Sequence, residues 1–198
     1  MLFNQNIEVN NHLIIDADVL IFNCTFKFTA NGRITVSDNH NAYFINSYFF
    51  ACDNMWKGIT VETGCRLAFN GCKIEDAIVA INADENAELF INNSTFNRNI
   101  TGISNNNGAQ ASGGLLVSSF SNNNFTTTAE LNNGDPIGLR AIFLEHTSAV
   151  FSAAQQTTCS HLRFGVQSEY SDVLIRNMVF EDLLNIGVEV EDGSAEVY

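Results

Sequence analysis

The stretch Leu89-Phe-Ile-Asn-Asn-Ser-Thr-Phe96 contains the pattern on which the fold depends. Apolar side chains alternate at Leu89 and Ile91, Asn93 follows two residues later, and a Phe closes the unit at position 96. Alternation with a period of two is typical of a β-strand that is buried on one face. Asn tolerates the left-handed backbone conformation, so its position after the strand predicts a sharp corner.

The same unit recurs along the chain. Its corner position is filled by Asn23, Asn46, Asn93, Asn122 and Asn177, with Gly71 in one further copy. A second series joins a small residue to a β-branched one and recurs about every 22 residues, at Gly58-Ile59, Ala80-Ile81, Gly102-Ile103, Ala141-Ile142, Gly165-Val166 and Gly187-Val188. The longer step from Gly102 to Ala141 indicates an insertion. Self-similarity at a fixed period predicts a repeat architecture.

Three short strands and three corners fit in such a repeat. If each repeat forms one coil, equivalent residues of successive coils lie about 4.8 Å apart, which is the spacing between strands in a sheet. The sequence therefore predicts an all-β, right-handed parallel β-helix of about 8 rungs, with Ile, Val and Phe columns inside and an Asn ladder along one edge. The alternative is a leucine-rich repeat, but its Leu-x-x-Leu-x-Leu pattern does not occur.

The repeat also predicts the domain organisation. We expect a single β-helix domain over residues 1–198, with inserted side loops at 104–138 within one rung. The pattern is still intact at Tyr198, whereas a solenoid needs a polar cap to end. We therefore expect either a piece of a longer solenoid or a chain whose uncapped end pairs with another chain.

Composition excludes two classes of partner. Nine Lys and Arg residues stand against 22 Asp and Glu, which gives a net charge of −13. A phosphate backbone and an anionic lipid surface both require a positive footprint, so we expect neither nucleic-acid nor membrane binding. No apolar run approaches the length of a membrane span.

The run Cys52-Asp-Asn-Met-Trp-Lys-Gly-Ile59, followed by Val61-Glu-Thr-Gly64 and Asn70-Gly-Cys-Lys-Ile-Glu-Asp76, carries a family resemblance. It resembles the β-helix repeats of the pectin-lyase-like superfamily and, more narrowly, large bacterial surface proteins that use type IX secretion. The resemblance covers roughly residues 14–198. It implies the fold and a secreted or cell-surface location, but it implies little about function, because lyases, hydrolases, adhesins and stalks share this fold.

A column of acidic residues follows the repeat-opening Ile or Val by three positions. Its members are Glu62, Asp84, Glu145, Glu169 and Glu191, with Asn106 interrupting the series. Like charges at strand spacing repel, so they either spread into solvent or share a cation, and several carboxylates are a ligand set that Ca²⁺ accepts. The column is therefore interpreted as a solvated edge, with a Ca²⁺ site as the alternative. We expect no other cofactor.

The insertion contains the candidate binding residues. Its two loops are rich in Asn, Ser, Thr and Gly, and insertions in solenoids often emerge on the binding face. The candidates for hydrogen bonds to a neutral glycan or a protein partner are Asn105, Asn106, Asn107, Asn132, Asn133 and Asp135.

Trp56 and the cysteines are interpreted as structural. Trp56 is expected to cover a corner of the core rather than to stack on a sugar. Cys24 and Cys72 are expected inside the solenoid, and a Cys52–Cys65 disulfide is an open alternative if the protein is exported.

Three functions remain in view. The first is a non-catalytic structural or adhesive module that contacts glycans or extracellular proteins. The second is a polysaccharide lyase or hydrolase, which needs clustered acids and a nearby base. The pairs Glu75-Asp76 and Glu181-Asp182 are too far apart for that chemistry and are expected to serve turns. The third is a filament subunit that stacks end to end.

Overall fold

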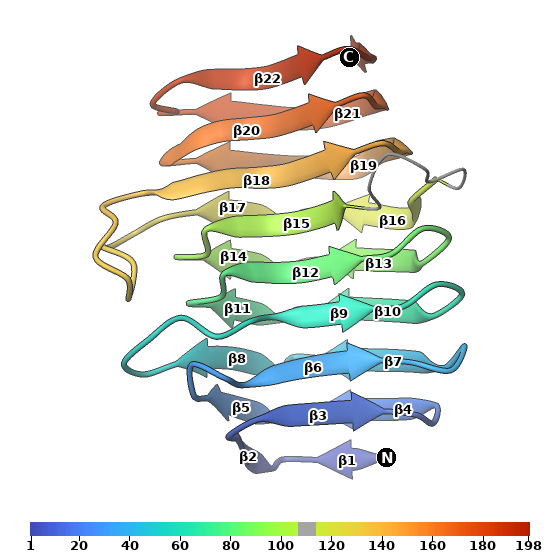
Figure 1. Cartoon of the computed structure of the whole chain (residues 1–198), viewed down its shortest axis with the longest axis vertical. Helices are drawn as coiled ribbons and strands as arrows, with labels where there is room; N and C mark the ends of the chain where they lie inside the picture. The colour runs from blue at the N-terminus through green and yellow to red at the C-terminus, as the bar shows by residue number, and fades with distance from the viewer. Residues whose placement is uncertain (107–113) are drawn as a thin grey trace.

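The computed structural model describes residues 1–106 and 114–198, and the described residues form no helix. Strands and tight corners build a right-handed parallel β-helix of about 8 turns, each of roughly 23 residues (Figure 1). The fold predicted from the repeat is confirmed. The strands form three parallel sheets, and each turn as far as β16 (Leu116–Ser121) contributes one strand to each sheet, whereas the later turns add strands only to the second and third sheets.

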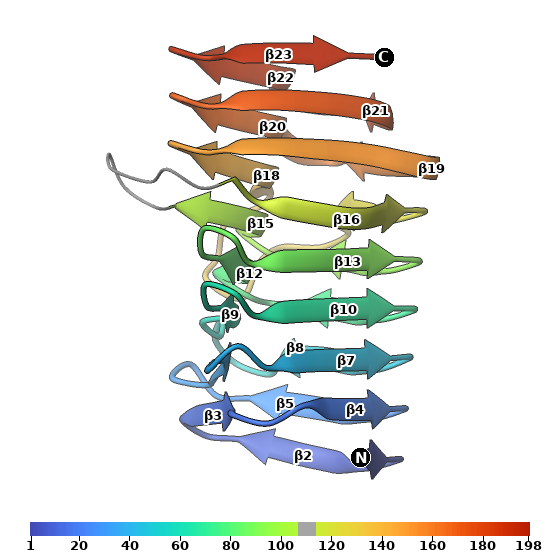
Figure 2. The same cartoon turned by 90° about the vertical axis from the view of Figure 1, so that its right-hand side faces the viewer.

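The strands of the three sheets follow one another in the order of the turns. Sheet A contains β1 (Leu2–Phe3), β4 (Val19–Phe22), β7 (Asn41–Ile45), β10 (Arg66–Asn70), β13 (Glu88–Asn92) and β16 (Leu116–Ser121). Figure 2 shows this sheet facing the viewer. Sheet B contains β2 (Asn6–Val9), β5 (Thr25–Phe28), β8 (Tyr48–Ala51), β11 (Lys73–Glu75), β14 (Thr95–Asn97), β17 (Asn124–Thr126), β19 (Ser148–Ser160), β21 (Asp172–Glu181) and β23 (Ser194–Val197). Sheet C contains β3 (His12–Ile15), β6 (Arg33–Val36), β9 (Ile59–Val61), β12 (Val79–Ala83), β15 (Thr101–Asn106), β18 (Gly138–Glu145), β20 (Leu162–Glu169) and β22 (Ile186–Glu191).

The corners between sheets A and B use the left-handed backbone conformation. All five Asn residues expected there have positive φ, between 48° and 55°: Asn23, Asn46, Asn93, Asn122 and Asn177. The Asn122 side chain donates to Asn93 Oδ1 at 2.9 Å, and Asn93 donates to Asn70 Oδ1 at 2.8 Å. Gly71 interrupts the ladder because a Cβ there would lie 2.5 Å from Asn46 Oδ1.

Replacing Asn93 with Ala tests this corner. Alanine at φ 53° carries a strain of about 1–2 kcal/mol and also loses the ladder hydrogen bonds. We expect the free energy of unfolding in urea to fall by about 2 kcal/mol. Asn93→Gly also removes the ladder hydrogen bonds, but glycine adopts a positive φ without strain. Its free energy of unfolding should therefore fall by less than that of Asn93→Ala. Equal losses in the two variants would contradict the conformational part of the explanation.

The interior holds the aromatic column that the pattern predicts. The rings of Phe26 and Phe49 stack with centroids 4.9 Å apart, and those of Phe96 and Phe125 stack at 4.4 Å. Trp56 is fully buried and stacks on Phe28 at 3.8 Å. Its indole nitrogen donates to the carbonyl of Glu75 at 2.7 Å, so the indole closes a corner of the core.

The cysteines do not pair. All five are free, with Cys52 exposed and Cys65 buried, and the disulfide left open by the sequence is not formed. A helix of the length and apolarity needed to cross a membrane is not found among the described residues.

The solenoid changes shape near its C-terminal end. Strand β19 runs on through the region where earlier turns have a corner, with a register shift between Ser152 and Thr157, whereas β21 keeps the corner residue Asn177 at φ 55°. This continuity explains why residues 149–164 fit the repeat pattern only at their start.

Candidate functional site

A groove of about 420 Å³ lies on the outer face of sheet A. The strand register places Tyr43, Ala68 and Phe90 directly beside one another on β7, β10 and β13. Side chains along a strand alternate between the two faces, and these three point away from the core. Because Ala68 is small, it forms the floor of a notch between two aromatic side chains.

Amide side chains form one end of the groove. Asn70 and Asn92 stand two residues after Ala68 and Phe90 on the same outer face. The oxygen of Asn70 accepts from Asn93 at 2.8 Å, and the oxygen of Asn92 accepts from the Ser119 hydroxyl at 2.9 Å. These bonds fix both amides. Among the described residues neither Nδ2 group has an acceptor, so both remain available as donors.

An ion pair bounds the groove at its other end. Arg66 Nη2 and Nε lie 2.6 and 2.8 Å from the Glu88 carboxylate. The guanidinium also lies 5.1 Å from the centre of the Phe90 ring. Hydrogen bonds to the side chains of Tyr43 and Glu88 raise the pKa of Arg66. The pair therefore adds almost no net charge to the site.

The lining itself carries no acidic or basic side chain and no histidine. Its members are Leu20, Tyr43, Phe44, Ile45, Ala68, Phe69, Asn70, Phe90, Asn92, Asn93, Ser119, Ser121 and Gln155. In a chain with a net charge of −13, this surface is unusually neutral. It can stack on a ligand and donate hydrogen bonds, and the Tyr43 phenol is its ionisable side chain.

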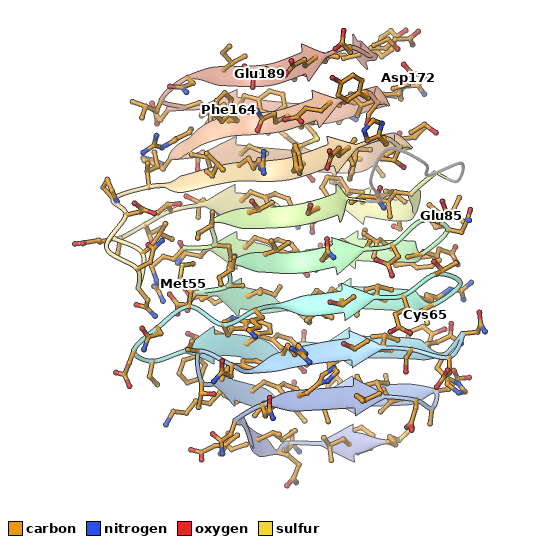
Figure 3. The ribbon with its side chains drawn as sticks, in the orientation of Figure 1. Met55, Cys65, Glu85, Phe164, Asp172 and Glu189 are labelled. Carbon is orange, nitrogen blue, oxygen red and sulfur yellow. The ribbon has the colours of Figure 1, made fainter. Side chains whose placement is uncertain are left out.

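A second groove, of about 720 Å³, lies further along the solenoid. Leu116, Val150 and Leu174 line it on neighbouring strands, together with Asp172 and Glu196. Both carboxylates are exposed. Figure 3 places Asp172 at the end of sheet B that adjoins the corner from sheet C.

The most strongly coupled charges lie at the corner between sheets B and C. Glu75 and Asp76 are almost fully buried, although sequence reasoning placed them simply in a turn. Arg98, one turn later, binds both oxygens of Asp76 at 2.9 and 3.0 Å. Its Nη1 lies 3.4 Å from Glu75. The cation thus contacts two buried carboxylates from the adjacent rung.

Neutral and charged donors complete the surroundings of Glu75. Asn97 donates to its carboxylate at 2.7 Å, Lys73 lies at 2.9 Å, and the Tyr48 hydroxyl also donates to it. Burial raises the pKa of Glu75, but the hydrogen bonds from Tyr48, Lys73 and Asn97 and the charge of Arg98 outweigh it, so that the pKa is lowered. Burial and the bond to Glu75 raise the pKa of Tyr48. No buried side-chain N or O atom in the described part of the chain lacks a partner, so this cluster is a closed structural network.

The comparison with protein families assigns the chain to a family. A model described as adenovirus EB1 55K protein / large t-antigen matches residues 7–137, which is more than half of the chain. The chain belongs to this family. No curated protein and no solved structure matches it. The family description names no reaction and no ligand, so the function of this member has to be argued from its own surface.

In this E1B 55K family member the acidic column lies in register, as its spacing predicts. Asn106, Glu145, Glu169 and Glu191 pair along sheet C, and Glu62 and Asp84 follow the paired residues Val61 and Ala83. Burial raises the pKa of Asp84. Within residues 1–106 and 114–198 no three His, Cys, Asp or Glu side chains gather as metal ligands.

The Ca²⁺ hypothesis has a direct test. If the acidic column binds the ion, millimolar Ca²⁺ should raise the melting temperature, because a ligand that binds only the folded state stabilises it. Glu169→Gln should reduce that rise. An unchanged melting temperature in Ca²⁺ would exclude the site.

The insertion residues are used largely within the protein. Asn132 donates to the Ala51 carbonyl at 3.4 Å, three rungs away, and Figure 1 shows the loop between β17 and β18 extending back along the solenoid. Asn133 and Asp135 bond to each other, at 2.8 and 3.0 Å. Asn105 is buried and donates to the Ala83 carbonyl. Asn107 lies outside the described residues, as does the side chain of Asn106. Ligand binding by these residues stays a prediction.

Sequence reasoning missed the sheet A groove. The repeat was identified from its inward and corner positions, and the groove consists of outward ones. A signal was nevertheless present: Tyr43, Ala68 and Phe90 each follow the first apolar residue of their unit by one position. Reading that outward column across successive repeats gives a small residue between two aromatic ones.

Proposed function

We propose that the chain is a non-catalytic recognition module that contacts glycans or protein partners through the outer face of its solenoid. The observation that carries this proposal is the sheet A groove, which has stacking and hydrogen-bonding groups but no Asp, Glu, His, Lys or Arg in its described lining. The same proposal includes a secreted or cell-surface location and a part in adhesion. The location and the adhesive role rest only on the resemblance to pectin-lyase-like surface proteins that use type IX secretion. The family match adds no support for either.

A competing candidate is a polysaccharide lyase or hydrolase acting in the second groove. It is favoured by the presence of two carboxylates, Asp172 and Glu196, in one hollow. Against it stand the exposure of both groups and the absence of any Lys, Arg or His from that groove's described lining.

Turnover assays separate the two candidates. The chain is incubated with neutral and uronate polysaccharides while reducing ends and unsaturated products are followed. We expect no product above the level of a buffer control. Product formation that the double variant Asp172→Asn, Glu196→Gln abolishes would overturn the non-catalytic proposal.

A further inference from the structure

The sheet A groove has a shape that suits a flat amphipathic ring. Strands β7, β10 and β13 are neighbours, so the backbones of Tyr43 and Phe90 are about 10 Å apart across Ala68. Two aromatic side chains separated by a methyl group leave room for a ring to lie over the Ala68 floor. The apolar C–H face of such a ring can pack against an aromatic side chain.

The amides fix the polarity of the ligand. The oxygens of Asn70 and Asn92 are occupied by Asn93 and Ser119, while the amide nitrogens have no acceptor among the described residues. The two free amide nitrogens are donors that call for acceptors on a ligand at this end, and hydroxyl oxygens meet that requirement. Hydroxyl groups around a ring with an apolar face are the features of a saccharide.

Charge decides between a neutral and an acidic saccharide. The lining has no basic side chain, and the nearby Arg66 is neutralised by Glu88 at 2.6 Å. With a net charge of −13 on the whole chain, an anionic ligand would be repelled without a local counter-charge. The groove therefore favours an uncharged ligand.

A peptide fits the groove less well. Extended peptides gain affinity by adding a strand to a free sheet edge. The floor of this groove belongs to β10, whose backbone already pairs with β7 on one side and with β13 on the other. Only side-chain contacts are left for a peptide.

We infer that the groove formed by Tyr43, Ala68, Phe90, Asn70 and Asn92 is a binding site for a neutral saccharide, with one sugar ring over Ala68. The inference rests on the proposed recognition function and names its ligand. Aromatic contact and the two amide donors provide the affinity, and the neutral lining provides selectivity against uronates and sialylated glycans.

The test is a glycan array with neutral and acidic members, followed by calorimetric titration with the neutral oligosaccharide that binds best. We expect binding to neutral members only. Phe90→Ala should weaken it about tenfold, as the loss of one aromatic contact predicts, and Ala68→Trp, which fills the notch, should abolish it. The matched controls are Val150→Ala in the second groove and Thr60→Trp on the outer face of sheet C, and both should bind like the wild type.

The outcomes separate this inference from the proposed function. Equal binding of acidic glycans, an array with no bound glycan, or full binding by Ala68→Trp with a normal melting temperature would overturn the saccharide site. A protein ligand bound through the same groove would also overturn it, while leaving the recognition function intact. Cleavage of the bound glycan would overturn the recognition function itself.

Discussion

Replacing Arg98 with Met is expected to lower the free energy of unfolding by about 3–5 kcal/mol, because it leaves the buried Asp76 carboxylate without its cation. Asp76 and Glu75 are each only 1% exposed, and Arg98 binds Asp76 through two hydrogen bonds. Methionine keeps much of the side-chain volume, so the loss reports on charge rather than on packing. Urea unfolding monitored by the fluorescence of the single Trp measures it.

The partly exposed pair of Arg66 and Glu88 supplies the control. Arg66→Met removes a cation from a carboxylate on the surface, where solvent already screens the interaction. Its effect on stability should be far smaller. Similar losses in the two variants would contradict the structural role assigned to the buried network.

The same network predicts how stability depends on pH. The pKa of Glu75 is lower in the folded chain than its ordinary value of 4.5. A carboxyl with a depressed pKa stabilises the fold above its unfolded pKa, and this stabilisation is lost as the pH falls through the folded pKa. Stability should therefore decline below about pH 4.5, and the decline should be shallower in Glu75→Gln.

Replacing Gly58 with Ala is the second large effect. Gly58 has φ +93°, and a Cβ there would lie 1.6 Å from the carbonyl oxygen of Val79 in the next turn. Backbone atoms of two rungs would have to separate, in addition to the strain of a positive φ. We expect a loss of at least about 3 kcal/mol in the free energy of unfolding, or failure to fold.

Gly134 isolates the conformational part of that loss. It has φ +87°, but a Cβ there meets no atom closer than 3.8 Å. Gly134→Ala should therefore show only the strain of its backbone conformation, about 1 kcal/mol. If Gly58→Ala lowered the free energy of unfolding no more than Gly134→Ala, that result would contradict the close approach of the two rungs at Gly58.

The sequence predicted the fold well because its strongest signals are repeated. Asn at αL corners and inward Phe, Ile and Val recur in most turns, and Asn23, Asn93 and Phe96 lie where their pattern placed them. A single Asn corner predicts little about the fold, whereas several corners at one fixed period predict a β-helix. The straightened corner in β19 was harder to predict, since no local residue type marks its absence.

The site could be predicted only in part, for physical reasons. Arg98 and Asp76 are 22 residues apart and meet because the turns stack, so their pairing depends on the register. Asn132, Asn133 and Asp135 were predicted as ligand-binding residues from composition; their side chains form hydrogen bonds within the chain, and ligand binding by them stays a prediction. Polar residues in an insertion satisfy their own backbone first. The sheet A groove is formed by the outward-facing column of Tyr43, Ala68 and Phe90, which does not belong to the inward apolar pattern from which the repeat is identified.

The most direct test of the proposed function is backbone amide chemical-shift mapping during titration with a neutral oligosaccharide. Saccharide recognition on sheet A predicts that the perturbed amides cluster on β7, β10 and β13 around Tyr43, Ala68 and Phe90, and that the sugar is recovered intact. Perturbations confined to residues 127–137, or to the second groove around Leu174, would contradict it.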